Sequence, residues 1–343
     1  MIPPQKSYPY YHKKRFANYF GEKSESVFWR SMLMFVQSWL MRRKTQPLLT
    51  EWVTTPEIIS PHHAQEPKIT WVGHSTFLIQ VSGITIITDP VFGDLSVLFK
   101  RITAPGIIVD KIPRIDIILI SHNHYDHMDE MTLRAIAAVN PHVIIAVPQG
   151  DKKWFDKRGF KQVREYMWWE HSVISLQNTA VRLTFLPAHH WSQRSLFDRN
   201  CSLWGSWMIQ ADKTTIYFAG DSAYDKHFTQ IARAFPAIDI ALMPIGPCEP
   251  RQWMRLSHMG PQEAGQAFLE LGARNFIPMH WGAYWFGIDY PLLPIERLHA
   301  WWQQEASALS NKQLYCMHIG QSLIINSVPE IISEKLSTTE HHI

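Results

Sequence analysis

The stretch Ser121–His127 reads Ser-His-Asn-His-Tyr-Asp-His, and it holds three imidazoles and one carboxylate. The run Ile115–Ile120, directly before it, is apolar and typical of a buried strand. After it, Asp129–Val139 has the spacing of an amphipathic helix. We therefore expect a strand-to-helix loop that carries its polar side chains at the carboxyl end of a strand.

The four metal-capable side chains of this loop indicate a metal site rather than packing. Imidazoles and carboxylates without partners are costly to bury, and protonated imidazoles would repel one another. The loop can present His122 and His124 to one divalent cation, and Asp126 and His127 to a second. Imidazole nitrogens and carboxylate oxygens suit zinc, and also iron or manganese. The alternative is an exposed polar loop without a cation.

Two cations need more ligands than one loop supplies, and three other stretches have the same design. In each, an apolar strand is followed at once by a metal-capable side chain: residues 185–192 (Phe-Leu-Pro-Ala-His-His-Trp-Ser), 217–222 (Tyr-Phe-Ala-Gly-Asp-Ser) and 276–282 (Phe-Ile-Pro-Met-His-Trp-Gly). A single His after a strand is more often structural than ligating. Together with the loop, however, these stretches complete a set of seven candidate ligands at the carboxyl ends of strands.

Short runs rich in Val, Ile, Thr and aromatic residues recur from residue 68 onward, and they predict strands. The predicted strands are Ile69–Val72, Thr76–Val81, Ile84–Thr88, Ile115–Ile120, Val143–Val147, Val181–Leu186, Thr215–Phe218, Ile238–Met243 and Asn275–Pro278. The predicted helices are Asp129–Val139, Asp225–Ala234, Gly260–Leu271 and Pro294–Ala308. This mixture indicates an α/β domain whose sheets are covered by helices, and the sequence shows no internal repeat.

The composition excludes several classes of protein. The chain has 343 residues, 46% hydrophobic and 18% charged, so it can bury a sizeable core. Its apolar runs are shorter than the roughly 20 residues that span a bilayer. Three scattered cysteines argue against a disulfide framework and favour a reducing, cytoplasmic compartment. Walker, G-x-G-x-x-G and G-x-S-x-G patterns are absent from the sequence, which argues against nucleotide-driven and serine-hydrolase chemistry.

The first fifty residues differ in charge from the rest of the chain. They carry nine Lys or Arg against two Glu in a chain whose net charge is +3, so the remainder is net acidic. Residues 26–44 place Phe, Trp, Met and Leu on one face of a predicted helix with a basic end. This helix either docks on its own domain or lies on an anionic membrane surface. The acidic body argues against nucleic-acid binding.

Several motifs resemble the metallo-β-lactamase superfamily: Ser121–His127, Gly220-Asp221 and Met279-His280-Trp281. Others resemble one branch, the N-acylphosphatidylethanolamine-hydrolysing phospholipases D, over about residues 65–290: Trp71–Ser75, Thr88-Asp89-Pro90, His190-Trp191-Ser192, Leu203–Trp207, Phe218–Asp221, Pro244-Ile245-Gly246 and Glu249-Pro250-Arg251. The resemblance implies an α/β fold, namely a metallo-β-lactamase-type αβ/βα sandwich, preceded here by an amphipathic helical extension. We accordingly expect an extension over residues 1–60, a metallo-hydrolase domain over 61–326 and a flexible tail over 327–343.

The resemblance also implies a dinuclear centre with two Zn²⁺ per chain, other divalent metals being possible. Carried over by position, the ligands of one zinc are His122, His124 and His190, those of the other are Asp126, His127 and His280, and Asp221 bridges both. The doublet His189-His190 departs from the family, which usually has a single His before the Trp. We assign His190 because it adjoins Trp191; if His189 were the ligand, only that label would change.

The implied activity is hydrolysis of a phospholipid by a metal-bridging hydroxide, which yields phosphatidate and an N-acylethanolamine. Asp126 and Asp221 would act on this hydroxide, and His258 matches a family position near the reacting phosphate. His258 could donate a proton to the leaving group or hold a phosphate oxygen, and Arg251 could do the latter. His74 would orient ligand side chains from behind, as would Asp89. The resemblance also implies a homodimer, whereas a peripheral membrane location would follow from the helix over residues 26–44 lying on a membrane surface.

Two other functions compete with this interpretation. One is a different hydrolase of the same fold, such as a lactonase or another phosphodiesterase. The other is a membrane-associated binding protein with a degenerate site, although all seven expected ligands are present in the sequence.

Overall fold

The computed structural model describes residues 9–18, 51–54 and 66–325, except residues 98, 177, 178 and 287. The predicted helix over 26–44 and the predicted tail over 327–343 lie outside these ranges, and both stay predictions. Within the described part of the chain, no helix combines the length and the apolar character needed to cross a membrane.

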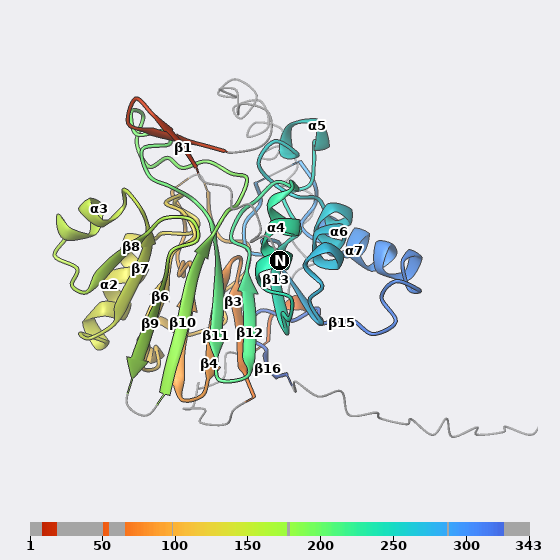
Figure 1. The fold of residues 1–343 in the computed structure, drawn as a ribbon, viewed down its shortest axis with the longest axis horizontal. Coiled ribbons are helices and arrows are strands. Elements are labelled where there is room, and N and C mark those ends of the chain that lie inside the picture. Colours follow the sequence, from red (N-terminus) through yellow and green to blue (C-terminus); the bar gives the residue numbers. More distant parts are fainter. Residues whose placement is uncertain are drawn as a thin grey trace, which may run out of the picture.

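Two seven-stranded sheets face each other in the described domain (Figure 1). The first has the order β16-β3-β4-β5-β6-β7-β8, and the second has the order β15-β14-β13-β12-β11-β10-β9. The strands of the first sheet are β3 (Lys68–Gly73), β4 (Thr76–Val81), β5 (Ile84–Thr88), β6 (Ile117–Leu119), β7 (Ile144–Pro148), β8 (Val163–Tyr166) and β16 (Ser322–Ile324). Those of the second are β9 (His171–Leu176), β10 (Thr179–Leu186), β11 (Ser206–Ala211), β12 (Thr214–Phe218), β13 (Ile240–Pro244), β14 (Asn275–Met279) and β15 (Gln313–Leu314).

The two sheets repeat one pairing scheme. In the first, β16, β3, β4 and β5 pair antiparallel, and β5 to β8 continue in parallel. In the second, β9 to β12 pair antiparallel, and β12 to β15 continue in parallel. The structure thus contains a topological repeat that the sequence does not show, because a shared backbone path requires no shared side chains.

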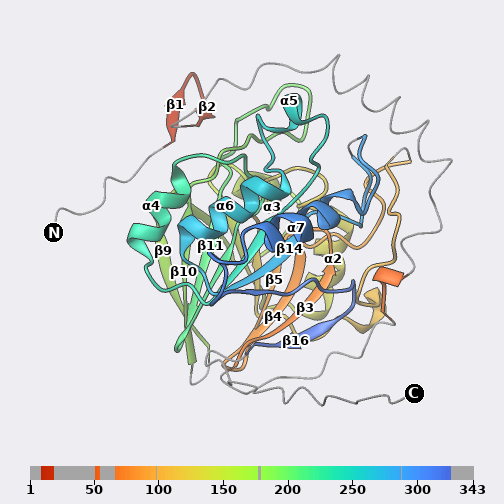
Figure 2. The ribbon, with the colours of Figure 1, turned by 90° about the vertical axis from the view of Figure 1, so that its right-hand side faces the viewer.

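Helices cover the outer faces of the sandwich. The described helices are α2 (Glu130–Val139), α3 (Lys152–Asp156), α4 (His227–Ala234), α5 (Arg251–Met254), α6 (Pro261–Leu271), α7 (Leu293–Gln304) and the 3-10 turn η2 (Val109–Lys111). In Figure 1, α2 and α3 lie on one side and α4, α6 and α7 on the other, and Figure 2 shows the second group from the front. This order of layers, helix–sheet–sheet–helix, confirms the predicted sandwich.

The inner strands of the first sheet, β4 to β7, are buried throughout and largely apolar because both faces of the sheet are covered there. In β4, Phe77 and Ile79 point into the large cluster between the sheets, whereas Leu78 points into the cluster beneath α2. In β6, Leu119 belongs to the inner cluster and Ile118 to the outer one. Alternate side chains of one strand therefore build two cores.

All nine predicted strands and all four predicted domain helices are present, with ends that differ by a few residues. The other five strands of the two sheets, β8, β9, β11, β15 and β16, were not predicted from the sequence. The edge strand β9 exposes most of its side chains, and β8 carries charged residues at its centre, so neither has a clear apolar pattern. The strand β11 begins with Ser206-Trp207, which in the sequence belongs to the motif Leu203–Trp207.

Both described pieces of the N-terminal extension contact the domain. The hairpin of β1 (Tyr10–His12) and β2 (Arg15–Ala17) buries Phe16, whose N–H donates to the carbonyl of Asn200 over 2.8 Å. In the second piece, residues 51–54, Trp52 packs edge-on against Trp281, with ring centroids 5.0 Å apart. The predicted domain boundaries remain predictions.

One close helix contact yields a stability test. A Cβ added to Gly265 of α6 would lie 2.3 Å from a ring carbon of Trp301 on α7. Alanine normally stabilises a helix interior relative to glycine, but overpacking costs about 1–3 kcal/mol and should prevail here. We expect Gly265→Ala to lower the melting temperature by several degrees. The exposed neighbour substitution Gln262→Ala should leave it nearly unchanged, and a more stable Gly265→Ala variant would contradict the packing.

Candidate metal centre

The seven candidate ligands meet at one end of the sandwich. Four follow β6, and the other three follow β10, β12 and β14. Hairpin β1–β2 and α5 lie at the same end, the upper end in Figure 1. Gly220 allows the loops after β6 and β12 to approach, because its φ is +58° and an added Cβ would lie 2.5 Å from the Cβ of Ser121.

Three imidazoles form the first group of donors, which we call the three-histidine group. Nδ1 of His124 lies 2.8 Å from Nε2 of His122 and 3.3 Å from Nε2 of His190. The neighbouring His189 turns away, and its Nδ1 lies 2.7 Å from a carboxylate oxygen of Asp225. The structure therefore places His190, rather than His189, beside the histidines of the loop.

The second group of donors, the aspartate–histidine group, contains Asp126, His127 and His280. Nε2 of His127 lies 3.3 Å from Nε2 of His280 and 3.4 Å from Oδ2 of Asp126. His74, which we expected to orient a ligand, places its Nε2 3.0 Å from the same Asp126 oxygen. His74 thus lies within the group as a fourth metal-capable side chain.

Asp221 lies between the two groups and faces both. Its Oδ2 lies 3.7 Å from Nε2 of His190 and 3.3 Å from Nε2 of His127. Its Oδ1 lies 3.0 Å from Nε2 of His280. One fully buried carboxylate thus reaches the three-histidine group on one side and the aspartate–histidine group on the other.

The donor spacing fits tetrahedral cation sites. Ligand atoms about 2.0–2.1 Å from a tetrahedral zinc lie roughly 3.3 Å from one another. The separations within each group, 2.8 and 3.3 Å in one and 3.3 and 3.4 Å in the other, are close to this value. Two nitrogens at such distances cannot satisfy each other unless a proton or a cation lies between them. The residues present therefore fit a pair of divalent cations.

Hydrogen bonds behind the ligands set which ring nitrogen carries the lone pair. Nδ1 of His190 lies 2.8 Å from the carbonyl oxygen of Ser257, which can only accept, so this nitrogen carries the proton. Nδ1 of His127 lies 2.6 Å from Oδ2 of Asp89, which holds it in the same tautomer. In both residues Nε2 is left with its lone pair toward the centre, as a metal ligand requires.

Asp89, predicted to support the ligands from behind, contacts one group directly and the other through Ser121. Besides His127, its carboxylate accepts hydrogen bonds from the backbone N–H of Ser121 over 2.7 Å and from the Ser121 hydroxyl over 2.5 Å. The Ser121 oxygen lies 2.9 Å from Nδ1 of His122. One buried carboxylate thereby orients His127 directly and His122 through a serine.

The charge states of two histidines and two aspartates of the site also suit cation binding. Burial lowers the pKa of His124 to about 3 and that of His190 to about 4, so both imidazoles are neutral at pH 7. Burial alone would raise the pKa of Asp221, but the surrounding imidazoles, first His127, hold it well below its usual range. The same balance lowers the pKa of Asp126. Neutral imidazoles and ionised carboxylates are the forms that bind metal.

Left-handed backbone conformations gather at the site. His74, Asp89 and His280 have φ values of 57°, 33° and 63°. Residues other than glycine adopt such backbone conformations at a cost of roughly 1–3 kcal/mol each. The surrounding fold maintains them at three residues that face or support the donors.

The two predicted substrate residues differ in their surroundings. Nδ1 of His258 lies 3.6 Å from Oδ2 of Asp221, so this imidazole borders the centre. Arg251, in contrast, donates to Oε2 of Glu263 over 2.6 Å and to the carbonyl of His258 over 2.7 Å. Arg251 therefore braces the segment that carries His258, and a direct contact between Arg251 and substrate stays a prediction.

Sequence reasoning missed a contact from the N-terminal hairpin. The side-chain amide of Asn18 pairs with the backbone of His190 in both directions, over 3.0 Å to its carbonyl and 3.2 Å from its N–H. Oδ1 of Asn18 also accepts from the indole of Trp204 over 2.9 Å. A single polar residue in an aperiodic arm offers no signal that could have predicted this contact.

A second missed residue, Arg194, holds the loop after β6. Its guanidinium donates to the carbonyls of Asn123 and Met128 over 3.1 and 2.6 Å, and it lies 4.3 Å from the ring centroid of Tyr125. The loop that supplies four candidate ligands is thus held at both ends by one cation.

Comparison with known proteins identifies related domains. The family model described as "Beta-lactamase superfamily domain" matches residues 85–281, more than half of the chain. The chain is 35% identical over 241 residues to the N-acyl-phosphatidylethanolamine-hydrolyzing phospholipase D 1 of Caenorhabditis elegans, which covers 67% of this chain and 68% of the relative. It is 36% identical over 236 residues to the mitochondrial enzyme of that name from Saccharomyces cerevisiae, but the match spans only half of the yeast protein.

Solved structures share the fold. Igni18, a metallo hydrolase from the archaeon Ignicoccus hospitalis, superposes with a TM-score of 0.54 at 20% identity and covers 75% of this chain and 97% of its own. At this identity the likeness concerns the arrangement of the sheets and helices.

The contact of Asn18 with the backbone of His190 yields a test at the centre. We expect Asn18→Ala to weaken metal binding about 10-fold, because His190 loses the partner that fixes its main chain, and changes behind metal ligands cost about 10–100-fold in affinity. Chelator competition measures the metal dissociation constant. Lys13→Ala, in the exposed turn of the same hairpin, is the matched control. Equal affinities for the two variants would show that the hairpin does not support the site.

Proposed function

Because this chain belongs to the metallo-β-lactamase superfamily and is a metal-dependent hydrolase, we propose that it is a zinc-dependent phosphodiesterase of the phospholipase D type. Its substrates are N-acylphosphatidylethanolamine-like phospholipids, and its products are phosphatidate and an N-acylethanolamine. The single observation that carries the proposal is the position of the Asp221 carboxylate between the three-histidine group and the aspartate–histidine group. The substrate class is taken from the Caenorhabditis elegans phospholipase D, to which this chain is 35% identical.

Zinc is the proposed metal because the donors are imidazole nitrogens and carboxylate oxygens at tetrahedral spacing. His122, His124 and His190 would hold one ion, Asp126, His127 and His280 would hold the other, and Asp221 would contact both. Two such ions lower the pKa of a water molecule toward neutrality and neutralise the oxygens of a phosphodiester.

The residues around the ions orient the reacting groups. Asp126 keeps one oxygen close to His74 and His127, so its carboxylate is held at the centre, where it can accept a proton from water. His258 borders the same space with an Nδ1 that has no hydrogen-bond partner within the described part of the chain. That nitrogen is placed to hold a phosphate oxygen or to pass a proton to the departing alkoxide. Arg251 supports it by binding the His258 carbonyl.

The decisive test combines a phospholipid panel with a variant of Asp221. We expect purified protein to contain zinc and to release N-acylethanolamine from N-acylphosphatidylethanolamine faster than it opens any lactone of a comparison panel. Asp221→Asn should lose metal and lower kcat/KM roughly a thousandfold, because the ions supply several kcal/mol of charge stabilisation.

The matched control is Asp212→Asn, the same substitution at the opposite end of β12, which should retain both metal and activity. Full turnover by the Asp221 variant, or preference of the wild type for lactones, would contradict the proposed function.

A peripheral membrane location completes the proposal. A two-tailed lipid must bring its headgroup to the centre from a bilayer, and residues 26–44 offer an apolar face with a basic end. The support for this role is the sequence pattern alone. The homodimer likewise rests on the family resemblance.

Testing the membrane role requires a variant that keeps residues 9–18, because Asn18 contacts His190. We expect the combined substitutions Trp29→Ser, Phe35→Ser and Trp39→Ser to lower activity on anionic vesicles about 10-fold, since they remove the apolar face. Activity on a short-chain soluble phosphodiester should not change. A matched control replaces Gln37 and Ser38 with alanine. Equal loss on both substrates would favour a helix docked on the domain.

A further inference from the structure

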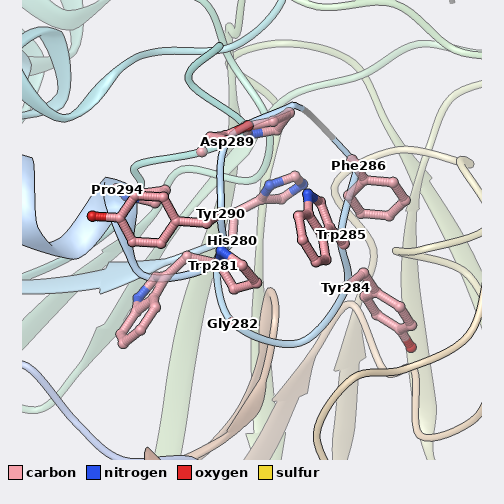
Figure 3. A pocket seen from close by; sticks show the side chains of 12 residues that line it. His280, Trp281, Gly282, Tyr284, Trp285, Phe286, Asp289, Tyr290 and Pro294 are labelled. Atoms are coloured by element: carbon pink, nitrogen blue, oxygen red, sulfur yellow. The ribbon is translucent and has the colours of Figure 1, made fainter. Parts of the chain in front are cut away.

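A pocket adjoins the centre on the side of His280 (Figure 3). Its walls come from the loop after β13, at Gly246 and Pro247, and from the segment after β14 that includes Trp285 and Asp289. The pocket is not enclosed and opens to solvent. His280 belongs both to the wall of this pocket and to the aspartate–histidine group, so a molecule in the pocket would lie next to the reacting centre.

The pocket contains a buried acceptor. Asp289 is only 8% exposed, and its Oδ2 accepts hydrogen bonds from the backbone N–H and the thiol of Cys248, over 3.1 and 3.2 Å. Its Oδ1 is buried and has no hydrogen-bond partner among the described residues. A buried carboxylate oxygen without a donor is costly, so the site calls for an N–H or O–H group from outside the described chain.

The pocket also contains a buried donor. Nε2 of His280 faces the centre, 3.0 Å from Oδ1 of Asp221, so a cation bound there leaves the proton on Nδ1. That Nδ1 is buried and has no partner among the described residues, unlike Nδ1 of His127 and of His190. Ligand imidazoles almost always donate from their second nitrogen. His280 therefore lacks an acceptor at the position where one is expected.

The remaining surface of the pocket is largely aromatic. Trp285 and Phe286 lie beside His280 in Figure 3, and Tyr290 lies on its other side. Such walls suit alkyl chains and planar groups. Cys248, which binds Asp289, lies in the loop after β13. This loop is anchored to α7, because the neighbouring Glu249 accepts a hydrogen bond from Arg297 over 2.6 Å.

One donor and one acceptor between aromatic walls match a secondary amide. An amide offers a carbonyl to accept from Nδ1 of His280 and an N–H to donate to Oδ1 of Asp289. An ester offers only the carbonyl, which leaves Asp289 without a donor. An ammonium group offers donors but no acceptor, which leaves His280 without a partner.

We propose that this pocket binds the amide of the leaving N-acylethanolamine and that Asp289 determines the preference for N-acylated lipids. The inference rests on the proposed function and names its specificity residue. Asp289 recognises the substrate amide N–H, while His280, already a ligand candidate, holds the amide carbonyl. A phospholipid with a free amine or an ester at this position satisfies one of the two groups and leaves the other unpaired.

The test compares two substrates that differ at one atom. One is an N-acylphosphatidylethanolamine, and the other has an ester oxygen in place of the amide N–H. We expect the wild type to prefer the amide by roughly 10-fold or more in kcat/KM, because a site built for an N–H rejects the analogue that lacks it. Asp289→Ala should reduce this ratio to about 1. The ratio does not depend on the fraction of folded protein or on vesicle binding.

A second variant sharpens the test. In Asp289→Asn, the backbone N–H of Cys248 would hold the amide oxygen, which turns the Nδ2 donor toward the pocket, so the preference should disappear or reverse. Asp116→Asn removes another buried carboxylate, one that accepts from the Thr85 N–H far from the centre, and should keep the wild-type ratio.

The outcomes separate the two proposals. An unchanged preference for the amide in both Asp289 variants would overturn the inference and leave the phospholipase assignment intact. Equal turnover of amide and ester by the wild type would overturn it as well. A wild-type protein that hydrolyses neither phospholipid would overturn the proposed function and this inference with it.

Discussion

The geometry of the centre depends on one buried carboxylate that is not itself among the seven candidate ligands. Asp89 fixes the tautomer of His127 directly and turns His122 through Ser121, so it acts on both donor groups at once. It is fully buried, and its backbone is left-handed. Burial raises its pKa, and the hydrogen bonds that it accepts from His127 and Ser121 oppose that shift. The ligand set is therefore organised from inside the sandwich.

The repeated pairing scheme explains where the chemistry lies. In each sheet the fourth strand from the antiparallel edge is where the pairing changes from antiparallel to parallel, at β5 in one sheet and β12 in the other. The loops after these strands carry Asp89 and Asp221. The next strands, β6 and β13, carry the ligand loop in the first sheet and the wall of the aromatic pocket in the second. The loops after β6 and β13 thus occupy corresponding places in the two halves, and they supply four of the candidate metal ligands in one half and part of the proposed substrate pocket in the other.

The sequence predicts the centre better than its surroundings, for a physical reason. Strand periodicity and the dense loop Ser121–His127 are local signals, and strand ends in an α/β sandwich converge whatever the intervening residues are. Asn18 and Asp289 show no such signal, because their roles arise from contacts with residues far away in the chain. Arg251 shows the converse problem: its motif is conspicuous, yet the structure pairs its guanidinium with Glu263.

The pairing of β16 with β3 has a consequence for biosynthesis. Residues 322–324 complete the first sheet by bonding to residues 68–70, so the edge of β3 has no strand beside it until almost the whole described domain has been translated. An open edge invites pairing with other chains. The first sheet therefore stays incomplete, with one edge of β3 open, until residues 322–324 have left the ribosome.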